Sequence, residues 1–185
     1  MKPEVVTRRT GFVSSYNLTA DYSKGISELT MCGPRNRQIA ADVTHYLHEA
    51  DGPVLVLSDR KSHCEILQTM LADLGTPAEL LTGDLSNRKR TETVERIRAG
   101  KVKAIVATGS LVGEGFDLPA LSAMFLTTPI KYAGRVTQYV GRVLRPAPGK
   151  DRAFIFDYQD QSGVLQASAR KRQELYQKNR WSVRS

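Results

Sequence analysis

The sequence has few of the residues that build metal sites or disulfide frameworks. Its 185 residues include two cysteines, Cys32 and Cys64, and three histidines. The cysteines are far apart and form no C-x-x-C pair, so neither a zinc site nor a disulfide scaffold is indicated. His45 and His48 can share one face of a helix, but no carboxylate or cysteine is spaced to complete a site. We therefore expect this chain alone to bind no metal ion.

No segment is apolar over the ~18 residues that a membrane-spanning helix needs, and no signal peptide opens the sequence. These two absences predict a soluble, cytoplasmic protein without membrane contact. The phosphate-binding loop G-x-x-x-x-G-K-[ST] is also missing, because Gly149-Lys150 is followed by Asp151 and has no glycine-rich segment before it. We therefore expect the isolated chain to have no ATPase activity.

Positive charge is what the sequence has in excess. Lys and Arg number 27 against 19 Asp and Glu, which gives a net charge of +8 and a pI near 9.7. This balance favours a polyanionic partner. The length and the hydrophobic content of 41% are those of one globular domain with a sizeable core.

Helix and strand patterns alternate along most of the chain. Helices are predicted from the capping box Ser62-x-x-Glu65 to Gly75, and at residues 36–50, 86–99, 136–145 and 164–180. Apolar runs typical of buried parallel strands are predicted at residues 53–58, 79–82, 104–108, 121–127 and 153–158. This order predicts a three-layer α/β fold with a mainly parallel sheet and helices on both faces. Ligands bind such sheets at the carboxyl ends of the strands, which here are the loops starting at Ser58, Gly83, Thr108 and Thr127.

The two ends of the chain are less regular. Residues 1–35 are predicted to form an interdomain connector with an edge strand at residues 9–16, as in a piece cut near an interdomain linker. Residues 36–163 form the α/β domain, and residues 164–185 form a basic, exposed C-terminal helix and tail. Basic blocks at residues 88–103 and 170–184 are candidate nucleic-acid contacts. Charged runs are usually solvated faces, however, and the second block is the weaker candidate, with docking of a neighbouring domain as its alternative role.

The segment at residues 138–146, Q-Y-V-G-R-V-L-R-P, is the most informative one. On a helix its valines lie on one side, as a stripe for burial. The opposite side carries one amide and two arginines, Gln138, Arg142 and Arg145, and Pro146 then ends the helix. Two arginines on one rigid face, beside Gly141, suit a polyphosphate. A surface helix that is simply rich in arginine is the alternative.

The spacing Q-x-x-G-R-x-x-R resembles the last conserved motif of superfamily 2 helicases. The resemblance implies that Arg142 and Arg145 are catalytic residues that reach the γ-phosphate of ATP, with Gln138 beside them. It also implies that Gly141 lies against the nucleotide.

The loop after residues 104–108 has the pattern T-x-S…G-x-G-x-D-x-P, which resembles the fifth helicase motif. The resemblance implies that Thr108 and Ser110 bind the nucleic-acid backbone. It further implies that Asp117 accepts a hydrogen bond from a ribose hydroxyl. The nucleotide-binding residues of this loop would be Gly113, Glu114, Gly115 and Asp117. A cap or turn role for Asp117, ahead of Leu118-Pro119, is the alternative.

Two further segments extend the resemblance on the nucleic-acid side. Ser58, Asp59 and Arg60 match the fourth motif, in which a strand delivers polar groups to bound nucleic acid. Gly83, Asp84 and Arg90 match the pattern H-G-x-x-x-x-x-x-R, although a threonine stands where histidine is frequent. Asp84 is equally well read as a turn residue.

Residues 36–170 thus resemble the second, C-terminal RecA-like domain of a superfamily 2, DEAD/DEAH-box-type helicase. The resemblance implies two kinds of partner: single-stranded or duplex DNA or RNA, and the N-terminal RecA-like domain of the same protein. ATP and Mg²⁺ would bind only together with that first domain, because this chain also lacks the D-E-x-[DH] box.

Two other interpretations stay open. A stand-alone, non-catalytic nucleic-acid-binding module of the same fold would bind single strands without ATP, and Arg142 and Arg145 would be dispensable. An unrelated doubly wound nucleotide enzyme would need a glycine-rich turn directly after the first strand, where Ser58-Asp59-Arg60-Lys61 stands.

Overall fold

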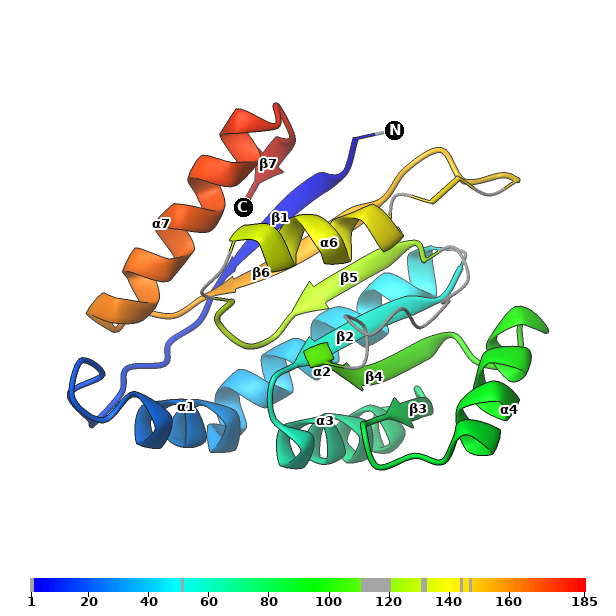
Figure 1. Cartoon of the computed structure of the whole chain (residues 1–185), viewed down its shortest axis with the longest axis horizontal. Helices are drawn as coiled ribbons and strands as arrows, with labels where there is room; N and C mark the ends of the chain where they lie inside the picture. The colour runs from blue at the N-terminus through cyan, green and yellow to red at the C-terminus, as the bar shows by residue number, and fades with distance from the viewer. Residues whose placement is uncertain (1, 51, 111–120, 131–132, 144, 147) are drawn as a thin grey trace.

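Seven strands form one sheet in the computed structural model, which describes residues 2–50, 52–110, 121–130, 133–143, 145–146 and 148–185. They are β1 (Glu4–Arg9), β2 (Val54–Ser58), β3 (Ala78–Leu81), β4 (Ala104–Thr108), β5 (Ala123–Leu126), β6 (Phe154–Gln159) and β7 (Ser182–Arg184). Their order across the sheet is β3-β4-β2-β5-β6-β1-β7, and each neighbouring pair is parallel. The predicted parallel α/β sheet is confirmed (Figure 1).

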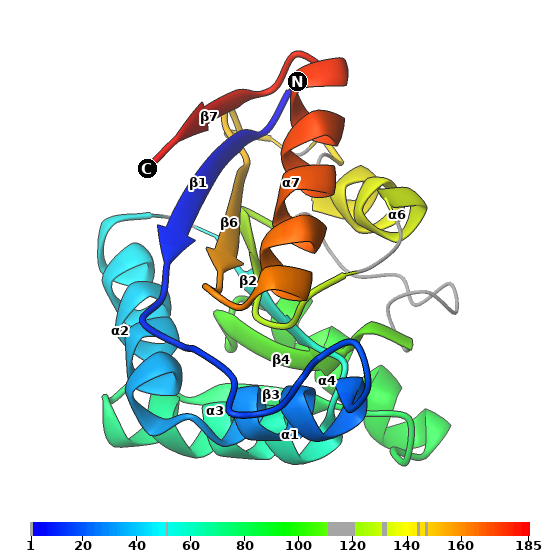
Figure 2. The same cartoon turned by 90° about the vertical axis from the view of Figure 1, so that its left-hand side faces the viewer.

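Helices cover both faces of this sheet (Figures 1 and 2). They are α1 (Tyr22–Met31), α2 (Gly33–Glu49), α3 (Lys61–Asp73), α4 (Asn87–Arg98), α6 (Ala133–Val143) and α7 (Gly163–Lys178). One core cluster joins α2 and α3 to the sheet, and a second joins α4, α6 and α7 to the opposite face. None of these helices is long and apolar enough to cross a membrane, within the part of the chain that the structure describes.

The central strands are buried on both faces, which explains their unbroken apolar sequence. In β2, Leu55 and Leu57 belong to the core under α4, α6 and α7, while Val54 and Val56 belong to the core under α2 and α3. Successive side chains of a strand point to opposite faces. A strand between two helical layers therefore needs apolar residues at every position.

The first 35 residues differ from the prediction. The strand lies at Glu4–Arg9 rather than at residues 9–16, and it is not at the edge, because it pairs with β6 on one side and β7 on the other. The connector predicted for residues 21–35 contains α1, whose Ile26 and Leu29 pack into a small core of their own. Tertiary burial outweighs the weak helical pattern of this segment.

Two helix boundaries also differ from the prediction. The Ser62-x-x-Glu65 capping box is wrong, because α3 begins at Lys61 and Arg60 stands at its N-cap without a side-chain cap bond. The α7 helix is not exposed throughout, since Leu165, Ala169 and Tyr176 are buried. At the start of α4 the Ser86 side chain caps the helix, a role that the predicted helix at residues 86–99 did not include. Gly75 and Gly100, with φ of 72° and 68°, follow the ends of α3 and α4.

Candidate functional site

A cleft of about 510 Å³ lies at the carboxyl ends of β2, β3 and β4. Its lining contains five of the eight predicted nucleic-acid-binding residues: Asp59, Gly83, Asp84, Thr108 and Ser110. These residues come from three separate sequence segments. They meet because the carboxyl ends of neighbouring parallel strands lie at one edge of the sheet. Thr82, Lys61, Gly109 and Arg135 complete the lining.

The cleft offers hydroxyl and carbonyl groups of the kind that contact a nucleic-acid backbone. Ser110 is exposed, and its Oγ donates a hydrogen bond to Thr108 Oγ1 at 3.4 Å. Arg90 does not line the cleft; its Nη2 donates to the Gly83 carbonyl oxygen at 2.8 Å. Arg90 thus supports the loop after β3 from the first turn of α4, which is a different role from the predicted direct contact.

Ser58 and Arg60 also lie outside the cleft lining. Ser58 is buried, and its Oγ lies 2.9 Å from His63 Nδ1 while accepting a bond from the Arg60 backbone N–H at 3.1 Å. The Arg60 guanidinium turns toward α1, where Nη2 donates to Ser23 Oγ at 3.1 Å. In this structure both residues shape the loop after β2 and do not present polar groups to the cleft.

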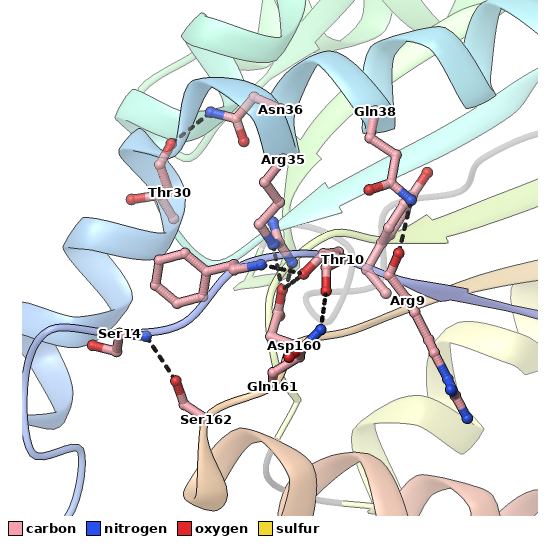
Figure 3. Close-up of polar contacts among 12 residues, drawn as sticks. Arg9, Thr10, Ser14, Thr30, Arg35, Asn36, Gln38, Asp160, Gln161 and Ser162 are labelled. Carbon is pink, nitrogen blue, oxygen red and sulfur yellow. Dashed lines mark hydrogen bonds and ion pairs between the residues drawn. The ribbon is translucent and has the colours of Figure 1, made fainter.

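A buried polar network joins the segments that follow β1 and β6 to α2 (Figure 3). Arg35 Nε donates to Asp160 Oδ1 at 2.7 Å, and Thr10 Oγ1 donates to the same oxygen at 2.5 Å. The next residue, Asn36, donates through Nδ2 to the Thr30 carbonyl and places Oδ1 2.9 Å from His63 Nε2. The network therefore runs from the carboxyl end of β6 through α2 to His63 of α3 and Ser58 at the end of β2.

His63 is the neutral centre of that network. Burial and, to a smaller extent, the nearby Arg35 cation together lower the pKa of His63 to about 3. A neutral imidazole has one donor and one acceptor nitrogen. The contacts fit an Nε2–H that donates to Asn36 and an Nδ1 that accepts from Ser58.

Two cations of the cleft, Lys61 and Arg135, were not among the predicted site residues. Lys61 is the first residue of α3 and forms an ion pair with Asp84. Arg135 comes from the start of α6, one turn before Tyr139. In the sequence nothing distinguishes Lys61 from other charged residues that face solvent. The only available signal for Arg135 was its place on the same helix as the arginine motif.

Asp59 and Gly109 line the cleft at the place where α6 approaches the sheet. The Asp59 backbone N–H donates to Thr128 Oγ1 at 3.0 Å, which fixes this residue against the end of β5. Burial raises the pKa of the Asp59 carboxyl, and the cations of Arg135 and Arg60 oppose that rise. A Cβ on Gly109 would lie 2.6 Å from Tyr139 Oη and 3.0 Å from Asp59 Oδ1, so only glycine fits there.

The arginine segment is helical, but α6 runs from Ala133 to Val143 and not from 136 to 145. Val136 and Val140 are buried as predicted, and Gln138 is exposed. Arg145 is exposed and lies beyond the end of the helix, which corrects the prediction that it shares a helical face with Arg142. The residue before a proline is driven out of the α conformation, so Pro146 ends the helix before Arg145.

Of the five predicted nucleotide-binding residues, the structure describes Gly141. Gly113, Glu114, Gly115 and Asp117 lie outside the described residues, as does the side chain of Arg142. Gly141 is exposed, and among the described residues a Cβ there would meet no atom within 4 Å. Among the described residues, no group of three or more His, Cys, Asp or Glu side chains is arranged to hold a metal ion.

Comparison with known proteins identifies the family. The model described as helicase conserved C-terminal domain matches residues 38–147, which is more than half of the chain. The transcript termination protein OPG145 of variola virus is 26% identical over 154 residues, covering 82% of this chain and 30% of that protein. The chain spans between 18% and 30% of the length of the curated relatives that it matches first.

Solved structures agree in fold. The crystal structure of UvsW from T4 superimposes with a TM-score of 0.76 at 18% identity, over 99% of this chain and 40% of that one. Dbp5 of S. cerevisiae, determined bound to RNA and ADP BeF3, gives a TM-score of 0.70 at 14% identity, over 99% of this chain and 41% of that one. The chain therefore belongs to the helicase conserved C-terminal domain family, and its fold is that of the C-terminal RecA-like domain of superfamily 2 helicases.

Proposed function

We propose that this chain is the C-terminal motor domain of an ATP-dependent nucleic-acid helicase or translocase. It supplies half of the single-strand track and the arginines that stabilise phosphoryl transfer. The observation that supports this most is the cleft at the ends of β2, β3 and β4. It gathers polar residues from three motifs, and α6, the helix that carries Arg142, forms part of its wall.

The proposed track binds the sugar–phosphate backbone and does not read bases. Its lining offers the Thr108 and Ser110 hydroxyls, the backbone around Gly83 and the cations of Lys61 and Arg135. Contacts of this kind position a strand without sequence information. That DNA or RNA is the polyanion is supported by the family and by the net charge of +8.

The proposed catalytic role needs a second domain. Arg142, Arg145 and Gln138 would face the γ-phosphate, and the loop with Gly113, Glu114, Gly115 and Asp117 would contact the nucleotide, beside Gly141. The phosphate-binding loop and the acidic box that holds Mg²⁺ would come from an N-terminal RecA-like domain of the same protein. ATP and Mg²⁺ are therefore cofactors of the two-domain assembly. In the related Dbp5 structure the protein is bound to RNA and ADP BeF3.

The test uses the 185-residue chain itself. Fluorescence anisotropy with labelled DNA and RNA homopolymers, over a range of salt concentrations, should show weak binding without sequence preference. The logarithm of affinity should fall with the logarithm of salt by about 0.7 per phosphate neutralised. Ser110→Asp, which adds a negative charge inside the cleft, should weaken binding much more than Ser27→Asp on the exposed face of α1.

Two results would overturn the proposal. One is an affinity that does not depend on salt or that discriminates strongly among homopolymers. The other is ATP turnover near the ~1 s⁻¹ of ordinary enzymes that survives extensive purification of the chain alone, because this chain would then hold a complete ATPase site.

A further inference from the structure

The proposed track has an unexpected charge pattern. Its described lining contains two cations, Lys61 and Arg135, and two carboxylates, Asp59 and Asp84. A surface that binds phosphates is expected to present cations alone, because like charges repel. Here Lys61 is in contact with Asp84, and Arg135 acts electrostatically on Asp59 of the same cleft.

Lys61 and Asp84 form the clearer pair. The Lys61 ammonium is in ion-pair contact with Asp84 and lies 4.0 Å from Glu65, one turn further along α3. The hydrogen bond from Lys61 to Asp84 raises the pKa of the lysine, and its Coulombic attraction adds to the effect. Both side chains are about half exposed, at 51% and 64%, so an incoming anion can reach them.

The position of Lys61 on α3 explains why it needs such a partner. The first residue of a helix lies at the positive end of the helix dipole, where a cation is disfavoured and an anion is favoured. A carboxylate satisfies both the lysine and the helix end, and a phosphate group would satisfy them equally well.

Arg135 and Asp59 are a second cation and a second carboxylate in the lining of the same cleft. Arg135 is the largest of the charges that lower the pKa of the Asp59 carboxyl against the effect of burial. The two residues come from different elements, the start of α6 and the loop after β2. The two charges therefore enter the cleft from the α6 side and from the carboxyl end of β2.

We propose that Asp84 and Asp59 compete with the backbone phosphates of a bound strand for Lys61 and Arg135. When a strand enters the cleft, the two cations exchange these carboxylates for phosphates. This inference rests on the proposed function and adds a regulation of the same site. Each phosphate must displace a carboxylate, so the strand is held less tightly than the cations alone would hold it. A motor that moves along a strand has to release each phosphate again, and the carboxylates take the cations back.

The test compares the wild-type chain with Asp84→Asn, using a labelled oligo(dT) and anisotropy over a range of salt. The variant frees Lys61, so its affinity should rise about two- to fivefold at low salt, the scale of one exposed ion pair. Its salt dependence should steepen by about 0.7, the contribution of one more phosphate contact. Asp59→Asn should act in the same direction through Arg135.

Asp21→Asn is the matched control. It changes the net charge by the same amount and frees Lys24 from an ion pair of 2.8 Å, but this pair lies at the start of α1 and does not line the cleft. Its affinity should stay within experimental error of the wild type. In a Lys61→Ala background, which should itself bind more weakly, Asp84→Asn should no longer raise the affinity.

The outcomes separate this inference from the proposed function. If the wild-type chain binds no oligonucleotide, the proposed function fails. If it binds with the expected salt dependence but Asp84→Asn matches Asp21→Asn or binds more weakly, the competition inference is overturned, because the carboxylate then has no inhibitory effect or contacts the strand itself. Equal urea midpoints for these surface variants ensure that affinity and not folding is compared.

Discussion

The hydroxyl of Tyr139 donates a hydrogen bond of 3.0 Å to the backbone carbonyl of Gly109. Tyr139 belongs to α6 and is buried, and Gly109 follows β4 between the two cleft residues Thr108 and Ser110. One bond thus joins the helix that carries Arg142 to the loop that is proposed to hold the strand. If α6 or the loop after β4 moved alone, this hydrogen bond would break. The two proposed sites are therefore mechanically linked.

This contact makes a first prediction about packing. Tyr139→Phe leaves the Gly109 carbonyl without its donor and should lower the free energy of unfolding by about 1 kcal/mol. Gly109→Ala should cost about 1–3 kcal/mol, because its Cβ would lie 2.6 Å from the Tyr139 hydroxyl. In the Tyr139→Phe background the alanine should cost less, and urea unfolding of all four proteins measures the difference.

Gly134→Ala is the control for that cycle. It lies on the same helix, and its Cβ would meet nothing within 4 Å, so it should be neutral or slightly stabilising. Strictly additive costs for Gly109→Ala and Tyr139→Phe would contradict the close approach.

The buried His63 predicts a specific loss of stability in acid. Its pKa is about 3 in the folded chain, against an ordinary value of 6.5. Below pH 6.5 the unfolded chain therefore binds a proton that the folded chain refuses. This contribution to stability is complete above pH 6.5 and falls by up to about 1.4 kcal/mol per pH unit as the pH drops toward 3. Urea unfolding at a series of pH values measures the slope.

The share of His63 in that slope can be separated from that of the carboxylates. His63→Gln should flatten the acid limb between pH 6.5 and the onset of acid unfolding, whereas the exposed His48→Gln variant should follow the wild-type curve. In the wild type the ring signals of His63 should remain those of a neutral imidazole at pH 5. A protonated ring in the folded state at that pH would contradict the burial of the His63 side chain.

The sequence predicted best those elements whose burial is local. The run A-I-V-A-T at Ala104–Thr108 is β4 to the residue, because a strand covered on both faces is apolar at each position. β1 was misplaced because its partner β6 lies about 150 residues away, and nothing in E-V-V-T-R-R reveals that pairing. β7 was not predicted, since three exposed residues at the edge of a sheet carry no apolar pattern.

The functional site likewise has a part that the sequence predicts and a part that it does not. Asp59, Gly83 and Thr108 could be predicted to meet because strand ends in a parallel sheet share one edge. The direction of a loop side chain depends on neighbours distant in sequence: Ser23 turns Arg60 away from the cleft, and Asp84 engages Lys61. Arg172 was read as part of a basic surface, but it is buried beside Asp157, because the helix that carries it packs on β6.

That buried pair gives a third prediction. Arg172 makes hydrogen bonds of 2.7 to 3.1 Å to Asp157, which also accepts a bond from the Tyr176 hydroxyl at 2.9 Å. Burial alone would lower the pKa of Arg172, but Asp157 raises it above its ordinary value. Arg172→Met leaves a fully buried carboxylate without its cation and should cost about 3–5 kcal/mol in urea unfolding.

Arg170→Met provides the comparison, because Arg170 is exposed on the same helix and its loss should change stability by less than about 0.5 kcal/mol. Replacing the whole pair, with Arg172→Met and Asp157→Leu together, should recover part of the loss, because no buried charge is left unpaired. Equal effects of Arg170→Met and Arg172→Met would mean that α7 does not dock on β6 through this pair.

The last prediction concerns Arg142 and Arg145 in the polypeptide that joins this chain to a first RecA-like domain. If both arginines meet charge that develops on the γ-phosphate, replacing either with Ala should lower turnover more than it weakens ATP binding. An arginine finger is worth on the order of 10³–10⁵ in rate, so we expect at least a ~100-fold loss. Lysine should rescue poorly, because a point charge cannot reproduce the guanidinium fork.

Arg142 and Arg145 differ in how the rest of the structure holds them in position. Arg142 belongs to α6, which Val136, Val140 and the Tyr139 hydrogen bond fix to the sheet, whereas Arg145 lies past the helix end. The Lys150 ammonium, which donates to the Arg145 carbonyl at 3.0 Å, is one described restraint on that segment. Lys150→Met should therefore lower turnover through Arg145 while leaving strand binding unchanged, and it should have no further effect in an Arg145→Ala background. Near-normal, nucleic-acid-stimulated ATPase in both arginine variants would show that the assignment of these arginines to the γ-phosphate is wrong.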